Sequence, residues 1–324
     1  MRLLALLLAL LCTTSVGARA KNALTWGPVV ARAAPGCDAF TPARGPDGRH
    51  YTSYGDCSGL TGTLPSLSMG FGRIQGGATN ISVQDLPTPD LTDVGHREAG
   101  YKPASALIVG TRMYMWVRNY APGGAQSRLK YSDNFMQAKS TWTWSVNLTN
   151  FGYPVFVQGA PGGYIYIVAH DNNSAYVPAN RFVLIRVSKN QLNNRSSYEF
   201  FNGSPNAPSW TKSYSKRGTF FTAAGECFRS GMSYNSARKR YYWWRNTGDS
   251  KTSKSFEVWS GEQPWGKWVR IYSTTEWDMS PGERGEFPIA WMGKESISAA
   301  GTLHLLFSGQ DQLVVRRATV ASGF

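Results

Sequence analysis

The 324-residue chain has few charged side chains, few cysteines and few histidines. Charged residues make up 17% of it, against about 25% in typical soluble domains. Its 4 cysteines are too few for a disulfide-dense scaffold. No histidines stand at ligand spacing from them, so a structural zinc site is disfavoured, and we expect neither a metal nor another cofactor.

The basic residues are not gathered in blocks. Lys and Arg number 34 against 20 Asp and Glu, a formal charge of +14, and they are scattered along the chain. This scatter disfavours a histone-like or basic-tail nucleic-acid binder. The chain also lacks the G-x-S-x-G, P-loop and H-E-x-x-H motifs, so lipase-like, nucleotide and zincin chemistry have no motif support.

Long apolar segments are lacking except at the start. Met1-Arg2, the apolar run Leu3–Leu11 and the segment Ala18–Ala20 have the order of a secretory signal peptide. We predict that residues 1–20 are removed and that residues 21–324 form a single secreted, extracellular and monomeric domain without a membrane span. Five N-glycosylation acceptors agree with export, namely Asn80, Asn147, Asn172, Asn194 and Asn202.

Glycine and aromatic residues are abundant, with 34 Gly, 12 Trp, 16 Tyr and 15 Phe. Short aromatic or β-branched runs alternate with Gly, Pro, Asn and Asp clusters, and no segment after the leader has sustained helical periodicity. One theme, a turn followed by a strand that ends in a polar pair, recurs around Tyr51, Tyr114, Tyr164, Tyr241 and Leu303. We therefore predict an all-β fold, a five-bladed β-propeller, with a pair of β-sandwiches as the alternative.

In a propeller, the first strand of each blade lines the central axis, and its start contributes to a shared funnel. Polar residues near these strand starts, or at the ends of the recurring strands, are therefore predicted to bind substrate. They are His96, Tyr101, Lys102, Arg118, His170, Asp171, Glu226, Arg229 and Glu286.

The most informative segment surrounds the hairpin turn Asp47-Gly48. Cys37 and Cys57 are expected to form a disulfide, because no other pair in the chain fits as well. An antiparallel register that joins them also places Asp38 opposite Asp56, and it requires a bulge or a three-residue loop. Two carboxyl groups with Cβ atoms about 5 Å apart suit acid and base catalysis on a glycosidic bond.

Each of these residues also has a simpler interpretation. Asp38 would cap a turn, and Asp56 would close a Gly-Asp bend. His170, next to a carboxylate, is either a proton shuttle or an ordinary hydrogen-bonding residue, and Tyr176 is a candidate base for β-elimination from a uronate. The aromatic run Tyr241–Trp244 is expected to be mostly packing, with a minority of rings available for stacking on sugars.

Several of these pieces together resemble a family of secreted five-bladed propellers that is similar to the endo-D-arabinanases, which cut mycobacterial arabinan. The matching pieces are Asp47–Tyr51 with Gly55-Asp56, Gly110–Trp116, His170–Tyr176, Ser197–Gly203, Pro264–Trp268, Glu276–Asp278 and Phe307–Asp311. The resemblance implies two aspartates on the first blade as acid and base, at Asp38 and Asp56. The flanking Cys37 and Cys57 depart from the usual pattern of this family.

The sequence thus predicts a secreted glycoside hydrolase whose partner is a polysaccharide or oligosaccharide. Two alternatives remain open at this point. The first is a polysaccharide lyase acting on uronates, which the positive charge and the His170–Tyr176 segment favour. The second is a non-catalytic glycan-binding propeller that uses the same funnel.

Overall fold

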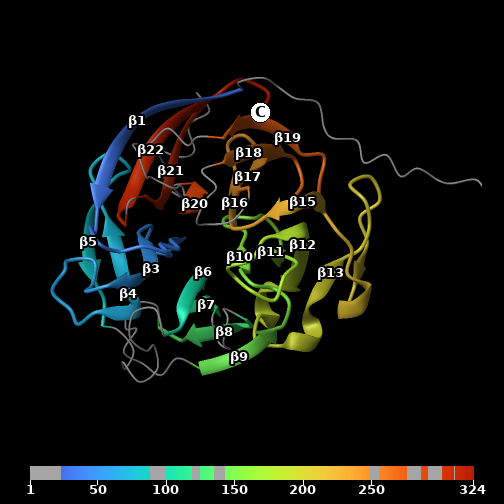
Figure 1. Ribbon diagram of the computed structural model, residues 1–324, viewed down its shortest axis with the longest axis horizontal. Helices are drawn as coiled ribbons and strands as arrows, with labels where there is room; N and C mark the ends of the chain where they lie inside the picture. Colours follow the sequence, from blue (N-terminus) through green and yellow to red (C-terminus); the bar gives the residue numbers. More distant parts are fainter. Residues whose placement is uncertain are drawn as a thin grey trace, which may run out of the picture.

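Five antiparallel sheets surround a common centre in the computed structural model (Figure 1). The structure describes residues 23–87, 100–118, 125–134, 143–247, 255–275, 286–290, 301–309 and 311–324. The first sheet contains β2 (Ala43–Arg44), β3 (His50–Cys57), β4 (Leu67–Gln75) and β5 (Ser82–Asp85). The second contains β6 (Lys102–Val109), β7 (Arg112–Arg118), β8 (Ser127–Ser132) and β9 (Thr143–Leu148).

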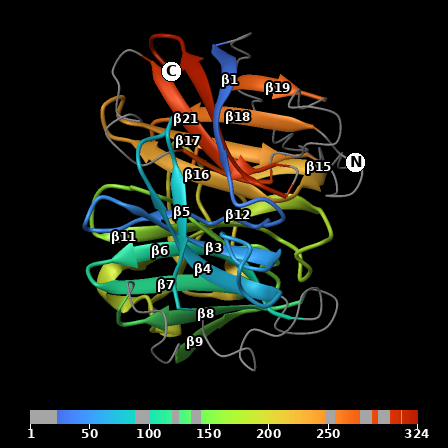
Figure 2. The same ribbon diagram turned by 90° about the vertical axis from the view of Figure 1, so that its left-hand side faces the viewer.

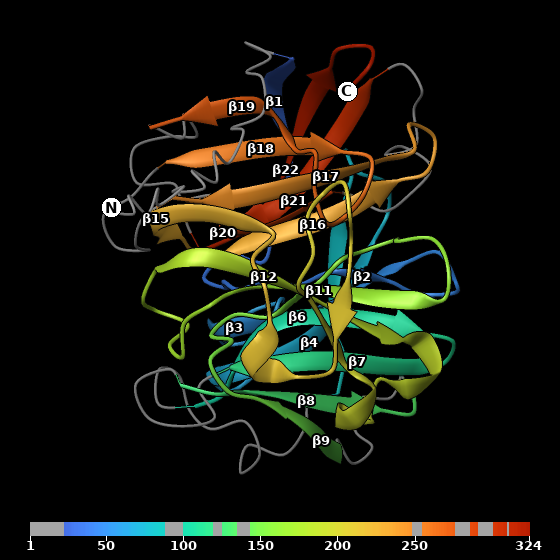
Figure 3. The ribbon, with the colours of Figure 1, turned by 90° about the vertical axis from the view of Figure 1, so that its right-hand side faces the viewer.

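The third sheet is the largest. It contains β10 (Val155–Phe156), β11 (Tyr164–His170), β12 (Ala179–Ser188), β13 (Glu199–Phe201) and β14 (Trp210–Thr211), and β15 (Phe221–Cys227) pairs with β12. Figure 3 shows β15 alongside β12 on the flank of the ring. These additional strands explain why the spacing between the recurring segments is widest here.

The fourth sheet contains β16 (Ser230–Asn235), β17 (Arg240–Asn246), β18 (Phe256–Gly261) and β19 (Val269–Thr274). The fifth sheet contains β20 (Glu286–Ala290), β21 (Thr302–Ser308), β22 (Leu313–Val320) and β1 (Leu24–Ala33). The early strand β1 pairs with β22, so the start of the described chain closes the last sheet (Figure 2).

This arrangement confirms the predicted all-β, five-bladed propeller. Helical structure in the described part of the chain is confined to three short 3-10 turns, η3 (Lys189–Gln191), η4 (Arg195–Ser197) and η5 (Tyr214–Lys216). No helix in that part is long and apolar enough to cross a bilayer. The proposed signal segment 1–20 lies outside the described residues.

The five recurring segments of the sequence all lie on the second strands of the sheets, β3, β7, β11, β17 and β21. Because neighbouring strands run antiparallel, the end of each second strand lies beside the start of the first. The register pairs Lys102 with Arg118, Ser230 with Arg245, and Glu286 with Ser308. The polar pairs that end the second strands therefore gather at one end of the ring.

The core lies between the sheets and is rich in aromatic side chains. All four side chains of the run Tyr241–Trp244 are buried, so none of them is a stacking platform for sugars. Trp243 contacts Phe182 and Phe221 of the third sheet with ring centroids 5.1 and 4.9 Å away. This cluster therefore fastens the third sheet to the fourth.

Candidate active site

The hairpin that carries Asp38 and Asp56 has a bulge that the register prediction did not place. Its tip is a three-residue loop, because Gly45 N–H donates to the Arg49 carbonyl at 2.7 Å. Further along, Asp38 forms an isolated bridge with Gly55 and not with Asp56. Ala39, in left-handed conformation at φ 54°, takes up the extra residue. The prediction that Asp38 lies directly opposite Asp56 is therefore wrong by one residue.

The bulge leaves the Asp38 carboxyl group packed over Gly55. Two backbone hydrogen bonds join these residues, at 3.2 and 2.9 Å, and a Cβ on residue 55 would lie 2.8 Å from Asp38 Oδ1. Glycine is needed at this position, because a methyl group would displace the carboxyl group. Asp38 is partly buried, and the residue that follows Gly55 is Asp56.

Asp56 is joined to the next sheet by an ion pair. Its carboxylate accepts from the Lys102 ammonium group, at the start of β6. The side chain of Lys102 is 4% exposed, whereas that of Asp56 is 33% exposed. The carboxylate thus lies between a buried cation and solvent, and Asp56 itself is in left-handed conformation with φ 56°. Such backbone conformations in non-glycine residues are found preferentially at functional sites.

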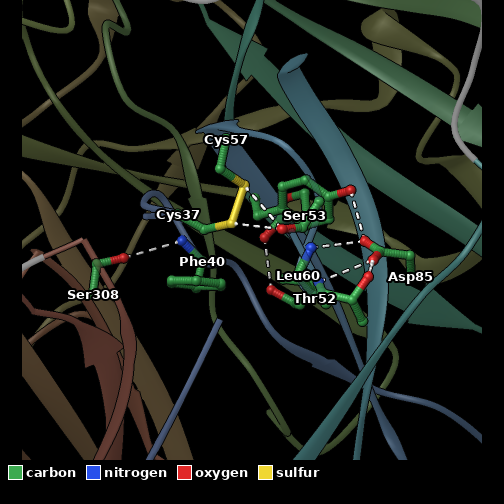
Figure 4. Close-up of a disulfide and its surroundings, with 11 residues drawn as sticks. Cys37, Phe40, Thr52, Ser53, Cys57, Leu60, Asp85 and Ser308 are labelled. Atoms are coloured by element: carbon green, nitrogen blue, oxygen red, sulfur yellow. Dashed lines mark hydrogen bonds between the residues drawn. A yellow bond between two sulfur atoms is a disulfide. The ribbon is translucent and has the colours of Figure 1, made fainter. Parts of the chain in front are cut away.

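The predicted disulfide between Cys37 and Cys57 is present, with the Cα atoms 4.9 Å apart. Figure 4 shows the hydrogen bonds around it. Phe40 N–H donates to Ser308 Oγ of the fifth sheet at 3.2 Å, and Leu60 N–H donates to Asp85 Oδ1 at 2.8 Å. Asp38 follows Cys37, and Asp56 precedes Cys57. The disulfide therefore links the two short segments that carry the candidate aspartates.

Removing the disulfide by Cys37→Ser with Cys57→Ser should lower the free energy of unfolding by about 3 kcal/mol. The disulfide closes the loop between the two cysteines, and this lowers the conformational entropy of the unfolded chain. Thermal denaturation should show a midpoint several degrees lower. The matched control is Cys227→Ala, since Cys227 is the free buried cysteine of the described chain. An unchanged midpoint in the double variant would contradict a stabilising role.

Burial also explains the chemistry of Cys227. Its thiol donates to the Ala223 carbonyl at 3.4 Å, and burial raises its pKa to about 11. The thiol stays protonated at neutral pH and is unreactive. Cys227 is therefore a buried free thiol.

A second group of side chains lies where the second, third and fourth sheets meet. Arg118, at the end of β7, and Arg229, just before β16, are each 4% exposed. The Arg118 guanidinium carbon lies 5.5 Å from the Tyr153 ring centroid and 5.2 Å from that of Tyr176. For Arg229 both distances are 5.7 Å. The two cations therefore flank the same pair of rings.

Tyr153 did not emerge from the sequence. It precedes β10, the first strand of the third sheet, so the rule of examining strand starts applies to it as well. Backbone contact brings its segment against the Tyr176 loop, because a Cβ on Gly152 would lie 2.2 Å from the Ser174 carbonyl oxygen. Only glycine permits this approach. Tyr153 is buried, whereas Tyr176 is 41% exposed.

His170 has no exposed surface, and its ring contacts that of Phe228, the residue before Arg229. Its Nε2 is 2.9 Å from the Ser174 carbonyl oxygen. Burial, with a smaller contribution from the nearby Arg229, lowers its pKa to about 4. The imidazole is therefore neutral, and its hydrogen bond holds the loop that ends in Tyr176. In this structure it cannot contact a polysaccharide directly.

Stability should fall between pH 7 and pH 5 because of His50 and His170. Burial lowers both pKa values from 6.5 to about 4, with Arg44 adding to the effect at His50. The unfolded chain binds these protons near pH 6.5 and the folded chain does not. The stability contributed is therefore complete above pH 6.5 and is lost as the pH falls toward 4. At pH 5 each histidine should cost about 2 kcal/mol.

Urea denaturation of wild type and of the His50→Gln with His170→Gln variant, at pH 7 and pH 5, measures this loss. The variant should lose less stability than wild type over this interval. Equal losses would assign the pH dependence to other groups.

Asp171 is committed to ion pairs, and Glu226 contributes its backbone carbonyl. Both oxygens of the Asp171 carboxylate are paired, with Arg181 at 2.5 Å and Arg217 at 2.9 Å. Its side chain is 5% exposed, so it ties the end of β11 to β12 and to the segment before β15. The Glu226 side chain is exposed, and its carbonyl accepts from Arg245 Nη1 at 2.9 Å.

The remaining predicted residues differ in how far the structure places them. Tyr101 is partly buried, and its carbonyl accepts from Ser68 Oγ at 2.7 Å. Glu286 begins β20 opposite Ser308, whose hydroxyl reaches the first sheet through Phe40. His96 lies outside the described residues. No cluster of three or more metal-ligating side chains occurs among the residues described.

Solved structures of glycoside hydrolases are similar in fold to this protein. A putative hydrolase from Bacteroides ovatus is similar with a TM-score of 0.56 and 14% identity, over 89% of this chain and 87% of that one. The catalytic domain of a GH62 α-L-arabinofuranosidase from Coprinopsis cinerea is similar with a TM-score of 0.53 and 8% identity, over 91% and 96%.

A GH43_1 enzyme from Xanthomonas citri has a TM-score of 0.51 and 12% identity, over 90% and 89%. The fold is shared with the GH43 and GH62 enzymes. At these identities the likeness extends to the fold alone. The sequence matches no protein-family model and no curated protein.

Proposed function

We propose that this protein is a secreted glycoside hydrolase that cleaves a polysaccharide, with Asp38 and Asp56 as its carboxyl pair. The observation that carries the proposal is the geometry of the first sheet. Asp38 is packed over Gly55, immediately before Asp56, and both lie at the end of the ring where the strand-terminal polar residues gather. The fold shared with glycosidases supports this choice of chemistry.

The environment of the two aspartates suggests their roles. The ion pair with Lys102 holds the partly exposed Asp56 carboxylate in place, and we assign it the role of the base. Asp38 would then be the acid. The acid protonates the glycosidic oxygen as its bond to the anomeric carbon breaks, and the base takes a proton from the water that attacks this carbon.

A uronate lyase is the second candidate function, and one specific observation favours it. The exposed Tyr176 ring lies against two buried guanidinium groups. In β-elimination, cations neutralise the uronate carboxylate while a base such as a tyrosine removes the neighbouring proton. The complete burial of His170 weakens the notion that it is the proton shuttle of such a reaction.

The proposal is tested by incubating the protein with neutral and acidic polysaccharides, including D-arabinan because of the family resemblance. New reducing ends without ultraviolet absorbance support hydrolysis. An unsaturated, ultraviolet-absorbing product indicates a lyase instead. Tight glycan binding without chain shortening over long incubation would identify a binding module and refute both enzymatic candidates.

A further inference from the structure

Arg118 and Arg229, which flank Tyr153 and Tyr176, form a buried cationic group that reaches the surface only at Tyr176. Both guanidinium groups are nine-tenths buried or more, as is Tyr153, while Tyr176 is partly exposed. Each guanidinium carbon lies within 6 Å of both ring centroids. Aromatic faces stabilise cations, but two positive charges that share the same two rings repel each other.

Arg118 differs from the buried Arg245 at this end of the ring. The buried Arg245 is paired with the Glu257 carboxylate, and the partly exposed Arg270, Arg181 and Arg217 are paired with Glu257 or Asp171. Arg118 Nε donates to the Pro103 carbonyl at 3.3 Å. Its Nη1 is buried and has no hydrogen-bond partner among the residues described. A buried guanidinium in this state is costly unless an anion joins it.

This group is next to the candidate catalytic carboxylates. Lys102 lies opposite Arg118 in the pairing of β6 with β7, and Lys102 holds Asp56. An anionic group bound by Arg118 would therefore be part of the substrate. It would lie on the sugar at the cleaved glycosidic bond or on a sugar near that bond.

We infer that Arg118 and Arg229 bind the carboxylate of a uronic acid residue in the polysaccharide substrate. The planar guanidinium fork matches a carboxylate through two parallel hydrogen bonds. The exposed Tyr176 ring offers a face on which the sugar stacks. This inference rests on the proposed function in taking the ligand to be a polysaccharide, and it narrows the substrate class to acidic glycans.

The test measures binding of uronate oligosaccharides, from polygalacturonate, alginate and glucuronoxylan, each beside its carboxyl-reduced neutral form. The protein carries Asp38→Asn, so that turnover does not consume the ligand. At least one acidic form should bind about tenfold or more tightly than its reduced form. Arg118→Gln should abolish this preference, and Arg118→Lys should keep part of it, because the charge remains but the fork is lost.

Arg49→Gln is the control for net charge, since Arg49 is half-exposed at the far tip of the hairpin. It should leave the preference intact. If Arg118→Gln does not fold, Arg229→Gln takes its place in the test and should likewise abolish the preference for the acidic form. Equal binding of every acidic and reduced pair, preference only for a sulfated glycan, or equal losses in the Arg118 and Arg49 variants would overturn the inference. Cleavage of neutral glycans alone would overturn it and leave the hydrolase proposal standing.

Discussion

Asp38→Asn and Asp56→Asn should each lower kcat/KM for the cleaved polysaccharide by about three orders of magnitude, because proton transfer by a positioned group contributes about 10²–10⁴ in rate. Asparagine has nearly the shape of aspartate but cannot exchange a proton with substrate or water. The close contact between residue 38 and Gly55 is preserved in the first variant. Initial rates of reducing-end formation measure the effect.

The control for this prediction is Asp47→Asn, at the opposite end of the same hairpin. The Asp47 carboxylate accepts hydrogen bonds from Arg49 Nη1 and from the Tyr51 hydroxyl. The rate of this variant should remain near that of wild type. Because Asp56→Asn leaves the buried Lys102 without its carboxylate, that variant should also be less stable. Adding Lys102→Met should restore stability but not activity. Wild-type turnover in either aspartate variant would refute the proposed catalytic pair.

Trp243→Ala should lower the free energy of unfolding by about 4 kcal/mol, the largest stability effect that we expect. Trp243 is fully buried in β17, and its ring contacts Phe182, Phe220 and Phe221 of the third sheet. It also contacts Trp259 and Trp268 of the fourth sheet. Deleting the indole opens a cavity between two blades, and the rigid sheets cannot close it.

The matched variant is Trp243→Phe, which keeps a ring in place. The indole Nε1 has no hydrogen-bond partner among the residues described, so no polar contact is lost with it. We expect this variant to lose less than about half as much stability as Trp243→Ala. Urea denaturation followed by circular dichroism measures both. A loss below about 1 kcal/mol in Trp243→Ala would mean that this cluster does not join the blades.

The prediction of the propeller succeeded because a blade repeats a local pattern. A turn, an aromatic or aliphatic strand and a terminal polar pair are encoded within about ten residues, and all five copies lie on second strands. The hairpin of the first sheet was predictable for the same reason. Its turn and the disulfide between Cys37 and Cys57 follow from short-range spacing, whereas the choice between a bulge and a three-residue loop was left open, and the structure has both.

The register at Asp38 was not predictable, because a single left-handed residue, Ala39, shifts the partner from Asp56 to Gly55. No residue type in the sequence marks this bulge. The environment of the run Tyr241–Trp244 was likewise not predictable. Alternation assigns its side chains to the two faces of a strand, but it does not say whether each face is buried or exposed. In a propeller both faces of an interior strand pack on neighbouring sheets, so all four rings are buried.

The sequence by itself determined the class of fold, the number of blades and the covalent link beside the two candidate aspartates, because each depends on residues near one another in the chain. Tertiary structure alone decided which charges meet. The pairing of Lys102 with Asp56 and the convergence of Arg118 and Arg229 on Tyr153 and Tyr176 join different sheets. Such contacts depend on how whole blades pack, and no local pattern encodes that.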